Sequence, residues 1–121
     1  MKKIEAIIRP SKVDPVRKAL RMRGVETFEL FEAAGYGSEP RPVVAYRGAL
    51  HVVPSIPRIK LEVVVSDALA MPLLYDIVDA ARTGRIGDGH VLVSPVEAVV
   101  RIQTGEHLAE TIVLPRRAAS A

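Results

Sequence analysis

The chain has 121 residues, of which 49% are hydrophobic and 26% are charged, and its formal net charge is +3. This length fits one domain with a substantial core, and the composition is that of an ordinary globular protein rather than a disordered or fibrous one. No apolar run approaches the roughly 20 residues that a membrane-spanning helix needs. A modest positive charge with only 4% aromatic residues argues against a nucleic-acid interface and favours small anions as ligands.

The chain has no cysteine, which excludes disulfides and thiolate metal sites but leaves the cellular compartment open. Its first residues enter a strand pattern directly and lack the apolar core of a signal peptide, so we expect a cytoplasmic protein. Three histidines, His51, His90 and His107, are scattered without the paired spacing of a metal motif. No metal site is predicted from them.

The first predicted strand covers residues 3–9, which alternate between apolar and polar character. Its buried face consists of Ile4, Ala6 and Ile8, and Pro10 ends it. A helix follows, with Asp14 or Ser11 as the candidate N-cap. Glycine is a common helix terminator, so we place the end of this helix at Gly24. Strand character then returns over residues 25–37.

Residues 38–57 show no periodicity and contain four prolines that cannot donate to a sheet ladder, so they are predicted to form one long loop. A loop of this length in so small a domain is typically functional or disordered. This segment is also unusually apolar for a solvated loop. We interpret it as a surface that docks a partner; collapse of the loop onto its own domain is the alternative.

The second half repeats the order of the first. Residues 58–65 are the clearest strand, and Ser66 or Asp67 is predicted to cap a second helix. Proline disrupts a helix interior, so Pro72 is predicted to lie in the first turn. The buried face of this helix is predicted to consist of Leu73, Leu74, Ile77, Val78 and Ala81. A strand through Leu92 and an extended run over 99–103 follow. The C-terminal segment 107–121 is weakly patterned, and its residues 115–121 are predicted to form a disordered tail.

This order of elements, β-α-β, long loop, β-α-β, predicts an α+β fold. With right-handed crossovers it gives the ferredoxin-like arrangement, a four-stranded antiparallel sheet with two helices on one face. The other face of the sheet then remains uncovered, and we assign Ile7, Val64 and Val99 to it. Apolar side chains on an uncovered face predict oligomerisation.

The stretch 82–90, with sequence RTGRIGDGH, contains three glycines within six residues. Glycine tolerates positive φ, so the backbone N–H groups can turn toward one point and form a nest for phosphate oxygens, flanked by Arg82 and Arg85. The alternative is structural: Gly84 ends the helix and a tight turn at residues 87–89 enters the next strand. Composition alone leaves both interpretations open.

The chain resembles the nitrogen regulatory PII signalling proteins. The segments that carry the resemblance are KKIEAIIRP at 2–10, GYG at 35–37, YRGA at 46–49, RIKLEVVV at 58–65, AARTGRIGDG at 80–89 and VRIQTGE at 100–106. The resemblance covers residues 1–106. It implies a homotrimer of ferredoxin-like subunits that binds an adenine nucleotide in each cleft between subunits. It further implies that the loop at 38–57 reaches a partner protein.

Carried over by position, the resemblance assigns a nucleotide site. Ile7 and Val64 pack the adenine, with Glu62 close by, and Gly35 and Gly37 border the ribose and phosphates. The phosphate nest consists of Gly87, Asp88 and Gly89. His90, Arg101 and Gln103 complete the site, and we expect Arg101 and Gln103 on one face of a strand because they are two residues apart. The candidate contacts of the loop with an effector or partner are Glu39, His51 and Arg58.

Several positions depart from the family pattern. Glu39 replaces a glutamine that helps to hold magnesium and 2-oxoglutarate, His51 replaces a tyrosine, His90 replaces a lysine and Gln103 replaces an arginine. Fewer cations near the phosphates should weaken ATP most and AMP least. We therefore expect a regulator of a transporter or metabolic enzyme that senses AMP, ADP or ATP. We expect it to sense bicarbonate rather than 2-oxoglutarate, and the sequence leaves open whether magnesium accompanies the nucleotide.

Two alternatives stay open. One is standard nitrogen regulation, with an ammonium transporter or glutamine synthetase as the target. The other is a slow nucleotide hydrolase in which His90 acts as a base and Asp88 or Glu62 orients water. We expect no enzymatic activity, because the sequence shows no set of nucleophile, base and orienting group at linked spacing.

Overall fold

A computed structural model describes backbone and side chains for residues 1–36, 48 and 55–108, and the backbone alone for 43–46 and 49–52. The main body contains β1 (Lys2–Ile8), α1 (Val13–Met22), β2 (Glu29–Gly35), β5 (Ile56–Val65), α2 (Asp67–Ala81) and β6 (His90–Pro95). Two short hairpins add β3 (Val43–Tyr46) with β4 (Ala49–Val52) and β7 (Val99–Val100) with β8 (His107–Leu108).

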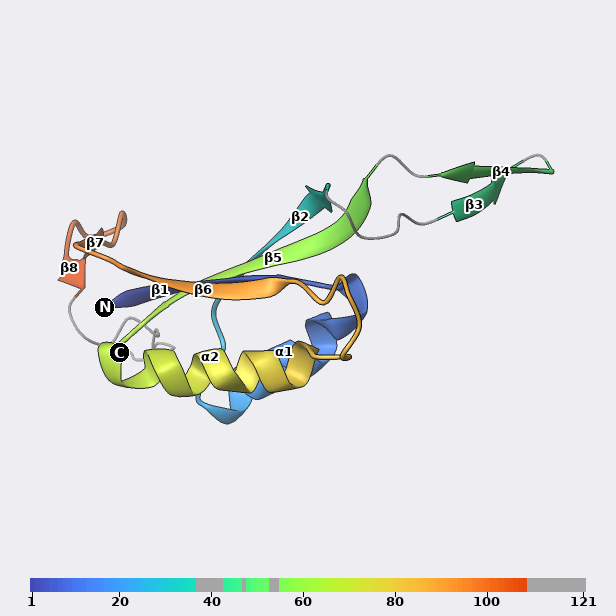
Figure 1. The fold of residues 1–121 in the computed structure, drawn as a ribbon. Coiled ribbons are helices and arrows are strands. Elements are labelled where there is room, and N and C mark those ends of the chain that lie inside the picture. Colours follow the sequence, from blue (N-terminus) through green and yellow to red (C-terminus); the bar gives the residue numbers. More distant parts are fainter. Residues whose placement is uncertain (37–42, 47, 53–54, 109–121) are drawn as a thin grey trace.

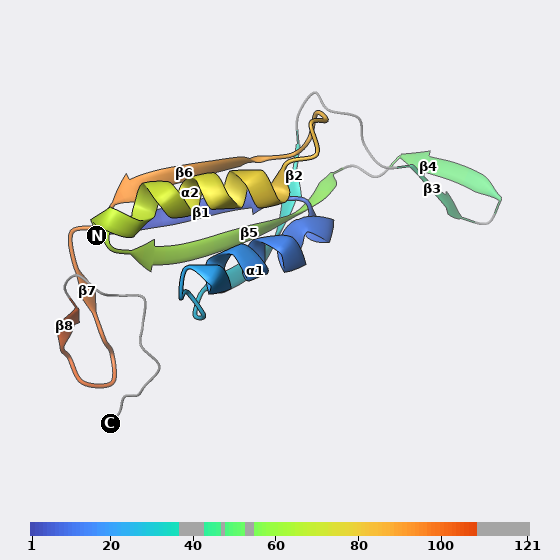
Figure 2. The ribbon, with the colours of Figure 1, turned by 90° about the horizontal axis from the view of Figure 1, so that it is seen from below.

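The central sheet has four strands in the order β2-β5-β1-β6, and every neighbouring pair is antiparallel. Both helices lie side by side on one face of this sheet, as Figures 1 and 2 show. This is the ferredoxin-like arrangement that the order of elements predicts, so the predicted fold class is confirmed. The hairpin β3–β4 extends away from one end of the sheet, and β7–β8 lies at the other end (Figure 1).

The core lies between the sheet and the helices. The predicted buried face of β1 is confirmed, because Ile4, Ala6 and Ile8 are at most 1% exposed. These side chains pack with Val16 and Leu20 of α1, with Leu61, Val63 and Val65 of β5, and with Ala70, Leu73, Ile77 and Ala81 of α2. The period of two in the strands and of three to four in the helices therefore directs all of these side chains to one interior. Of the face predicted for α2, Leu74 and Val78 are only partly buried.

The predicted start of α1 is wrong. A 3-10 turn over Pro10–Lys12 leads into the helix, whose N-cap is Lys12 and has no side-chain capping bond. The predicted end is confirmed: Gly24 adopts a φ of 84°, and the Gly24 and Val25 N–H groups donate to the Arg21 and Leu20 carbonyls. This pair of bonds is the Schellman motif, which requires a positive φ at the residue after the C-cap.

At the start of α2, Ser66 is the N-cap, and its hydroxyl accepts a hydrogen bond of 3.3 Å from the Leu69 N–H. Pro72 lies inside the helix rather than in its first turn, so that prediction is wrong. A proline at this position removes one helical hydrogen bond. The buried side chains of Ala70, Leu73 and Ile77 around it hold the helix on the sheet, because tertiary packing outweighs local propensity.

The uncovered face of the sheet carries apolar and charged side chains in register. One row across the four strands consists of Phe31, Lys60, Ile7 and His90, and the next consists of Glu29, Glu62, Glu5 and Leu92. Lys3 and Lys60 pair with two of the three glutamates in this row, through ion pairs of 2.9 Å to Glu5 and 3.0 Å to Glu62. Ile7 and Val64 lie on this face as predicted. Val99 does not, because it belongs to the β7–β8 hairpin outside the central sheet.

The predicted loop between β2 and α2 needs correction in both its content and its end. The predicted continuous loop 38–57 contains the antiparallel pair β3–β4, and Ile56 and Pro57 already belong to β5. Pro57 is tolerated in the strand because β1 ends its pairing at Ile59, so one edge of β5 is open at the proline. The period of two was obscured here by the closely spaced prolines.

The extended run predicted over 99–103 is also wrong. β7 ends at Val100, and residues 102–104 form a turn that is closed by hydrogen bonds from Arg101 N to Glu106 O (2.9 Å) and from Gly105 N to Arg101 O (2.8 Å). Gly105 has a φ of 72°, which permits this turn. Arg101 and Gln103 therefore do not share a strand face. β8 lies at the start of the C-terminal segment 107–121, and the predicted disordered tail at 115–121 lies outside the described part of the chain.

Candidate functional site

The glycine-rich segment 82–90 connects α2 to β6 at the end of the sheet from which β3–β4 extends (Figure 1). α2 ends at Ala81 with Arg82 as its C-cap, so Gly84 is not the helix cap that the structural alternative required. Positive φ values of 84° at Gly84, 99° at Gly87 and 96° at Gly89 turn the chain three times within this segment. Only glycine adopts such angles at little cost.

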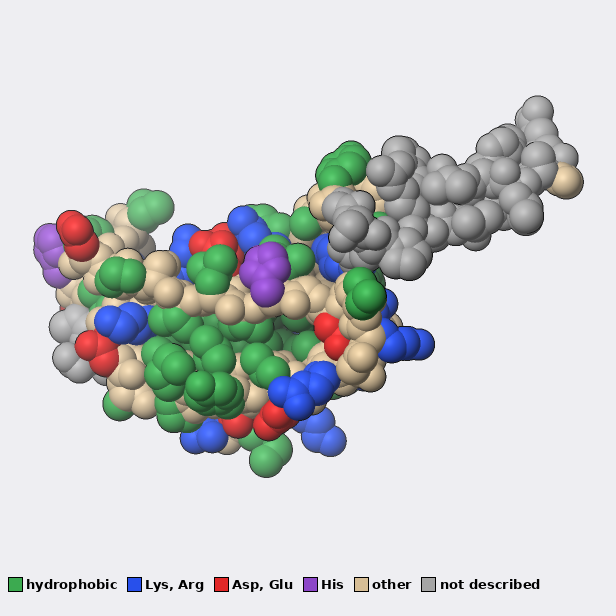
Figure 3. Space-filling view, viewed as in Figure 1, with side chains coloured by type: hydrophobic (Ala, Val, Ile, Leu, Met, Phe, Trp, Pro, Cys, Tyr) green, Lys and Arg blue, Asp and Glu red, His purple; other side chains and the backbone are tan. Residues whose placement is uncertain are grey.

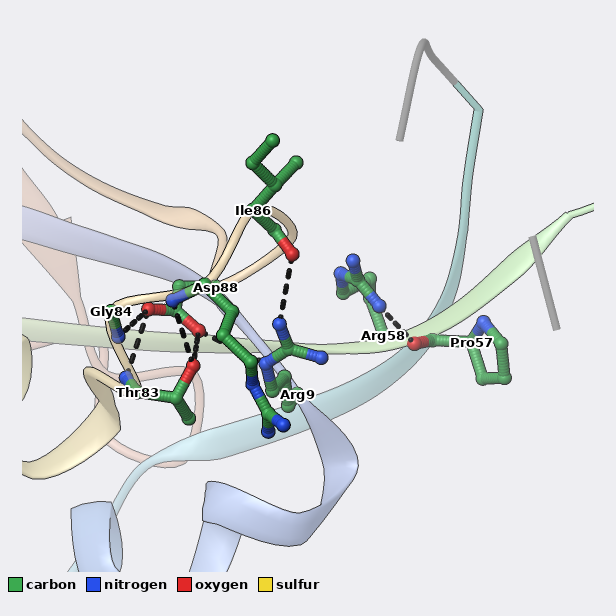
Figure 4. Close-up of polar contacts among 8 residues, drawn as sticks. Arg9, Pro57, Arg58, Thr83, Gly84, Ile86 and Asp88 are labelled. Carbon is green, nitrogen blue, oxygen red and sulfur yellow. Dashed lines mark hydrogen bonds and ion pairs between the residues drawn. The ribbon is translucent and has the colours of Figure 1, made fainter. Parts of the chain in front are cut away.

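The carboxylate of Asp88 organises the segment from within, as Figure 4 shows. Its Oδ2 accepts hydrogen bonds from the Thr83 N–H (2.8 Å) and the Gly84 N–H (2.9 Å), and its Oδ1 accepts one from the Thr83 hydroxyl (2.5 Å). These bonds with Thr83, together with the Arg9 guanidinium and the Gly84 N–H, lower the pKa of Asp88 far below its usual value. The carboxylate is therefore ionised throughout the physiological range.

Arg9 fastens this segment to the end of β1. Its Nε donates to Asp88 Oδ1 and its Nη2 to the Ile86 carbonyl, both at 3.0 Å (Figure 4). Gly89 lies directly against the same strand, because a Cβ at this position would overlap the Ile7 carbonyl oxygen. These contacts hold the segment against the end of β1.

A cavity of about 200 Å³ opens beside the segment, between α2 and the first residues of β6. It is lined by Ile7, Ile8, Val78, Ala81, Arg82, Asp88, Gly89, His90 and Val91. Figure 3 shows this side of the molecule, where apolar side chains gather between β6 and α2. Sites for drug-sized ligands usually enclose about 300–1,000 Å³. The cavity therefore accommodates only part of a nucleotide-sized ligand.

The structure brings several predicted site residues together. Ile7, Glu62, Val64 and His90 lie on the uncovered face of three adjacent strands, and Gly87, Asp88 and Gly89 adjoin His90 at the edge of that face. Gly35 ends β2 opposite Ile56. Of the loop residues, Arg58 is buried to 7% exposure and its Nη1 donates to the Pro57 carbonyl at 2.9 Å.

Other predicted residues are not brought together. Arg101 and Gln103 lie on the β7–β8 hairpin, at the opposite end of the sheet from the glycine-rich segment (Figure 1). Gly37 and Glu39 lie outside the described residues, and for His51 only the backbone within β4 is described. Within a single subunit the predicted nucleotide site is therefore divided into two separated parts.

Sequence reasoning missed two residues that shape the site. Arg9, the last residue of the first predicted strand, received no role in the site, and Thr83 was not singled out. The available signal was local: a hydroxyl residue five positions before an aspartate in a glycine-rich turn favours a side-chain to backbone hydrogen bond. The contact of Arg9 spans 79 residues, so no local pattern could have revealed it.

Across the residues whose placement is given, no group of three or more potential metal-ligating side chains converges. In the same part of the chain, no helix is long and apolar enough to cross a membrane.

The chain is similar to known proteins over nearly its whole length. The family model described as Nitrogen regulatory protein P-II matches residues 1–106. Proteins with that name from Azospirillum brasilense and Cereibacter sphaeroides are 50% and 46% identical over 106 residues, which is 88% of this chain and 95% of theirs. A third, from Rhodospirillum rubrum, is 45% identical over 112 residues and is covered completely. The chain belongs to the P-II family of nitrogen regulatory proteins.

Proposed function

We propose that this P-II protein is a signal-transduction regulator that binds an adenine nucleotide in clefts between the subunits of a homotrimer. Binding in the cleft controls a partner protein through the segment 38–57. The observation that carries the proposal is the division of the site: the glycine-rich segment and Arg101 lie at opposite ends of one subunit.

Two copies arranged end to end would unite the two parts of the site. One subunit supplies Ile7, Val64 and the glycine-rich segment, and its neighbour supplies Arg101. The cavity of about 200 Å³ lies between α2 and β6, so it would adjoin this cleft at the glycine-rich segment rather than form the whole site. A heterologous contact of this kind closes into a ring when its rotation is a whole fraction of a turn, and the proposed trimer is the ring in which that fraction is one third.

The uncovered sheet face supports association as well. Phe31 is 43% exposed and Leu92 is 42% exposed on this face, and Ile7 and Val64 lie between them. Apolar side chains on the free face of a sheet favour burial against a partner. Two lysines and two glutamates on the same face are already paired, Lys3 with Glu5 and Lys60 with Glu62, which lowers the charge that its burial would leave unpaired.

The residues on this face suit the parts of a nucleotide. Ile7 and Val64 offer apolar surface to the adenine ring, and the Glu62 carboxylate is an acceptor for its amino group. The backbone around Gly87 and Gly89 offers N–H groups to phosphate oxygens. Arg82 on the cavity wall and Arg101 of the neighbour supply positive charge, and a guanidinium pairs with phosphate in the bidentate manner.

We propose AMP, ADP and ATP as the ligands, with AMP least affected by the replacement of family cations at His90 and Gln103. Magnesium, if it accompanies ATP, would supply further positive charge to the phosphates. A partner transporter or metabolic enzyme would contact the segment 38–57. The names of the relatives favour nitrogen regulation, in which an ammonium transporter or glutamine synthetase is the target, over bicarbonate sensing.

Titration calorimetry with adenosine, AMP, ADP and ATP tests the nucleotide proposal, and native mass spectrometry tests the trimer. ATP titrations with and without magnesium, 2-oxoglutarate or bicarbonate identify the effector. We expect Arg101→Ala to weaken ADP and ATP about tenfold or more and adenosine little, because one charged contact to phosphate is lost. Arg21→Ala on the exposed side of α1 is the matched control. A monomeric protein, or one that binds none of these ligands, contradicts the proposal.

Mixing two variants tests whether the site is shared. In a mixed trimer of Arg101→Ala and Glu62→Gln subunits, an intact site forms wherever a subunit that retains Glu62 meets a neighbour that retains Arg101. Recovery of wild-type affinity at a fraction of the sites is the expected result. A site confined to one subunit would never recover, because every subunit carries one of the two substitutions.

The arrangement does not favour the nucleotide hydrolase. The Asp88 carboxylate is engaged by Thr83, Gly84 and Arg9, and that of Glu62 is paired with Lys60 at 3.0 Å, so neither is poised to orient water. Phosphate release during prolonged incubation with ATP, abolished in His90→Ala, would overturn this conclusion.

A further inference from the structure

The glycine-rich segment contains an anion of its own. The point toward which its first N–H groups turn is filled by the Asp88 carboxylate, which accepts from the Thr83 and Gly84 N–H groups at 2.8 and 2.9 Å. The carboxylate is only 23% exposed, and the Arg9 guanidinium covers it with an ion pair of 3.0 Å. Some of the backbone N–H groups that the sequence predicts as phosphate donors are thus already bonded to the Asp88 carboxylate of the same segment.

An internal carboxylate outcompetes an external phosphate for these donors. Asp88 is tethered five residues from Thr83, so it loses no translational freedom on binding, whereas a free ligand does. A phosphate approaching the same N–H groups would also meet a negative charge at contact distance. The Thr83 and Gly84 N–H groups and the Arg9 side chain are therefore removed from direct ligand recognition.

The same bonds also fix the backbone of residues 87–90, the end of the segment that does not donate to Asp88. Asp88 lies between Gly87 and Gly89, whose φ values of 99° and 96° leave the backbone with little intrinsic preference for this shape. The carboxylate ties the middle of the segment back to its start at Thr83, and Arg9 ties it to β1. With these anchors the backbone from Gly87 to His90 is held in one conformation beside the cavity.

We propose that Asp88 is a positioning residue: its carboxylate occupies the Thr83 and Gly84 N–H groups and Arg9, and thereby holds the Gly87–His90 backbone in the shape that receives the phosphates. This inference deepens the proposed nucleotide function and rests on it. Asp88 contributes order rather than a ligand contact. Its negative charge near the phosphates is tolerated because Arg9 neutralises it.

The first experiment measures how well the glycine-rich segment is ordered in the absence of ligand. Amide hydrogen exchange of Thr83 and Gly84 is compared in the wild type, Asp88→Asn and Thr83→Val, and the control Asp79→Asn makes the same change on the groove between α1 and α2. We expect exchange to accelerate in both segment variants at these amides, while the core amides of β1 stay protected. Unchanged exchange at Thr83 and Gly84 would overturn the proposal.

The second experiment measures the affinity for ADP and for adenosine. We expect Asp88→Asn and Thr83→Val each to weaken ADP by about tenfold, and adenosine by less than twofold, because only the phosphate-binding backbone is loosened. Thr83→Val keeps both charge and side-chain size, so it tests the network even if Asp88→Asn folds poorly. The double variant should lose no more than Asp88→Asn alone, because both substitutions break the same network.

Three results would refute the positioning role. Tighter ADP binding by Asp88→Asn would mean that the carboxylate merely repels phosphate. Equal losses for ADP and adenosine would indicate a general structural defect. Additive losses in the double variant would indicate independent roles. If the wild type binds no nucleotide at all, the proposed function fails, whereas the exchange data still decide whether Asp88 orders the segment.

Discussion

Gly89→Ala is the substitution whose effect follows most directly from the geometry. Gly89 has a φ of 96°, and a Cβ there would overlap the Ile7 carbonyl oxygen and lie 2.8 Å from the carbonyl carbon. The obstacle is backbone of the central strand, so no side-chain rotation can relieve it. β1 and the start of β6 would have to move apart.

Two costs add in this variant. An alanine in the left-handed region costs roughly 1–2 kcal/mol, and a forced backbone shift in a packed structure costs about 1–3 kcal/mol more. The total is about 2–5 kcal/mol. Gly24 and Gly84 provide matched controls, because both have a φ of 84° and a Cβ at either position meets nothing within 4 Å. Alanine at these two positions should cost only the roughly 1–2 kcal/mol of the backbone angle.

Urea unfolding of the three variants and the wild type at one protomer concentration measures these differences. The concentration must be fixed because the stability of an oligomer depends on it. We expect Gly89→Ala to lower the free energy of unfolding clearly more than either control. A value for Gly89→Ala within about 0.5 kcal/mol of Gly24→Ala would refute the steric reasoning, since only the backbone angle would then matter.

Three further predictions concern stability. Ile77 is fully buried, so Ile77→Ala should lower the free energy of unfolding in urea by about 2–5 kcal/mol. Met71 is 48% exposed on the same helix, so Met71→Ala should lower it by less than about 0.5 kcal/mol. Ser66→Ala removes the cap of α2 and should cost about 1 kcal/mol, which Ser66→Asp should largely restore; equal losses in both would contradict the capping role. Because the folded pKa of Asp88 is lowered, its stabilisation is complete above the ordinary value of 3.8 and is lost as pH falls below it. The stability difference between wild type and Asp88→Asn should therefore be constant above pH 3.8 and shrink below it, and a difference that grows on acidification would be inconsistent with this sign.

Much of the fold was predictable because its signals are local and periodic. Alternation in β1 and β5 and the apolar stripes of both helices direct the same side chains to one interior, and the order of elements then leaves few topologies. The errors occur where local propensity and tertiary structure disagree. Pro72 inside α2 and Pro57 inside β5 are tolerated only because packing and an open strand edge accommodate them, and neither is visible in sequence.

The candidate site was predictable only in part. The residues on one sheet face follow from the period of the strands, so Ile7 and Val64 were placed correctly. The role of Asp88 was not predictable from composition, because glycine-rich turns look the same whether their donors face a ligand or an internal carboxylate. The partnership of Asp88 with Arg9 depends on the meeting of two ends of the chain, which only the folded structure supplies.

The strand order has a consequence for how the chain folds during synthesis. β1 is made first, yet both of its neighbours, β5 and β6, come from the second half of the chain. A ribosome-bound chain that ends after α1 and β2 therefore has an apolar central strand without either partner. Such long-range pairing slows folding and delays it until the last strand emerges. The two similar halves are consequently one cooperative unit, and we expect that neither half, expressed alone, would fold.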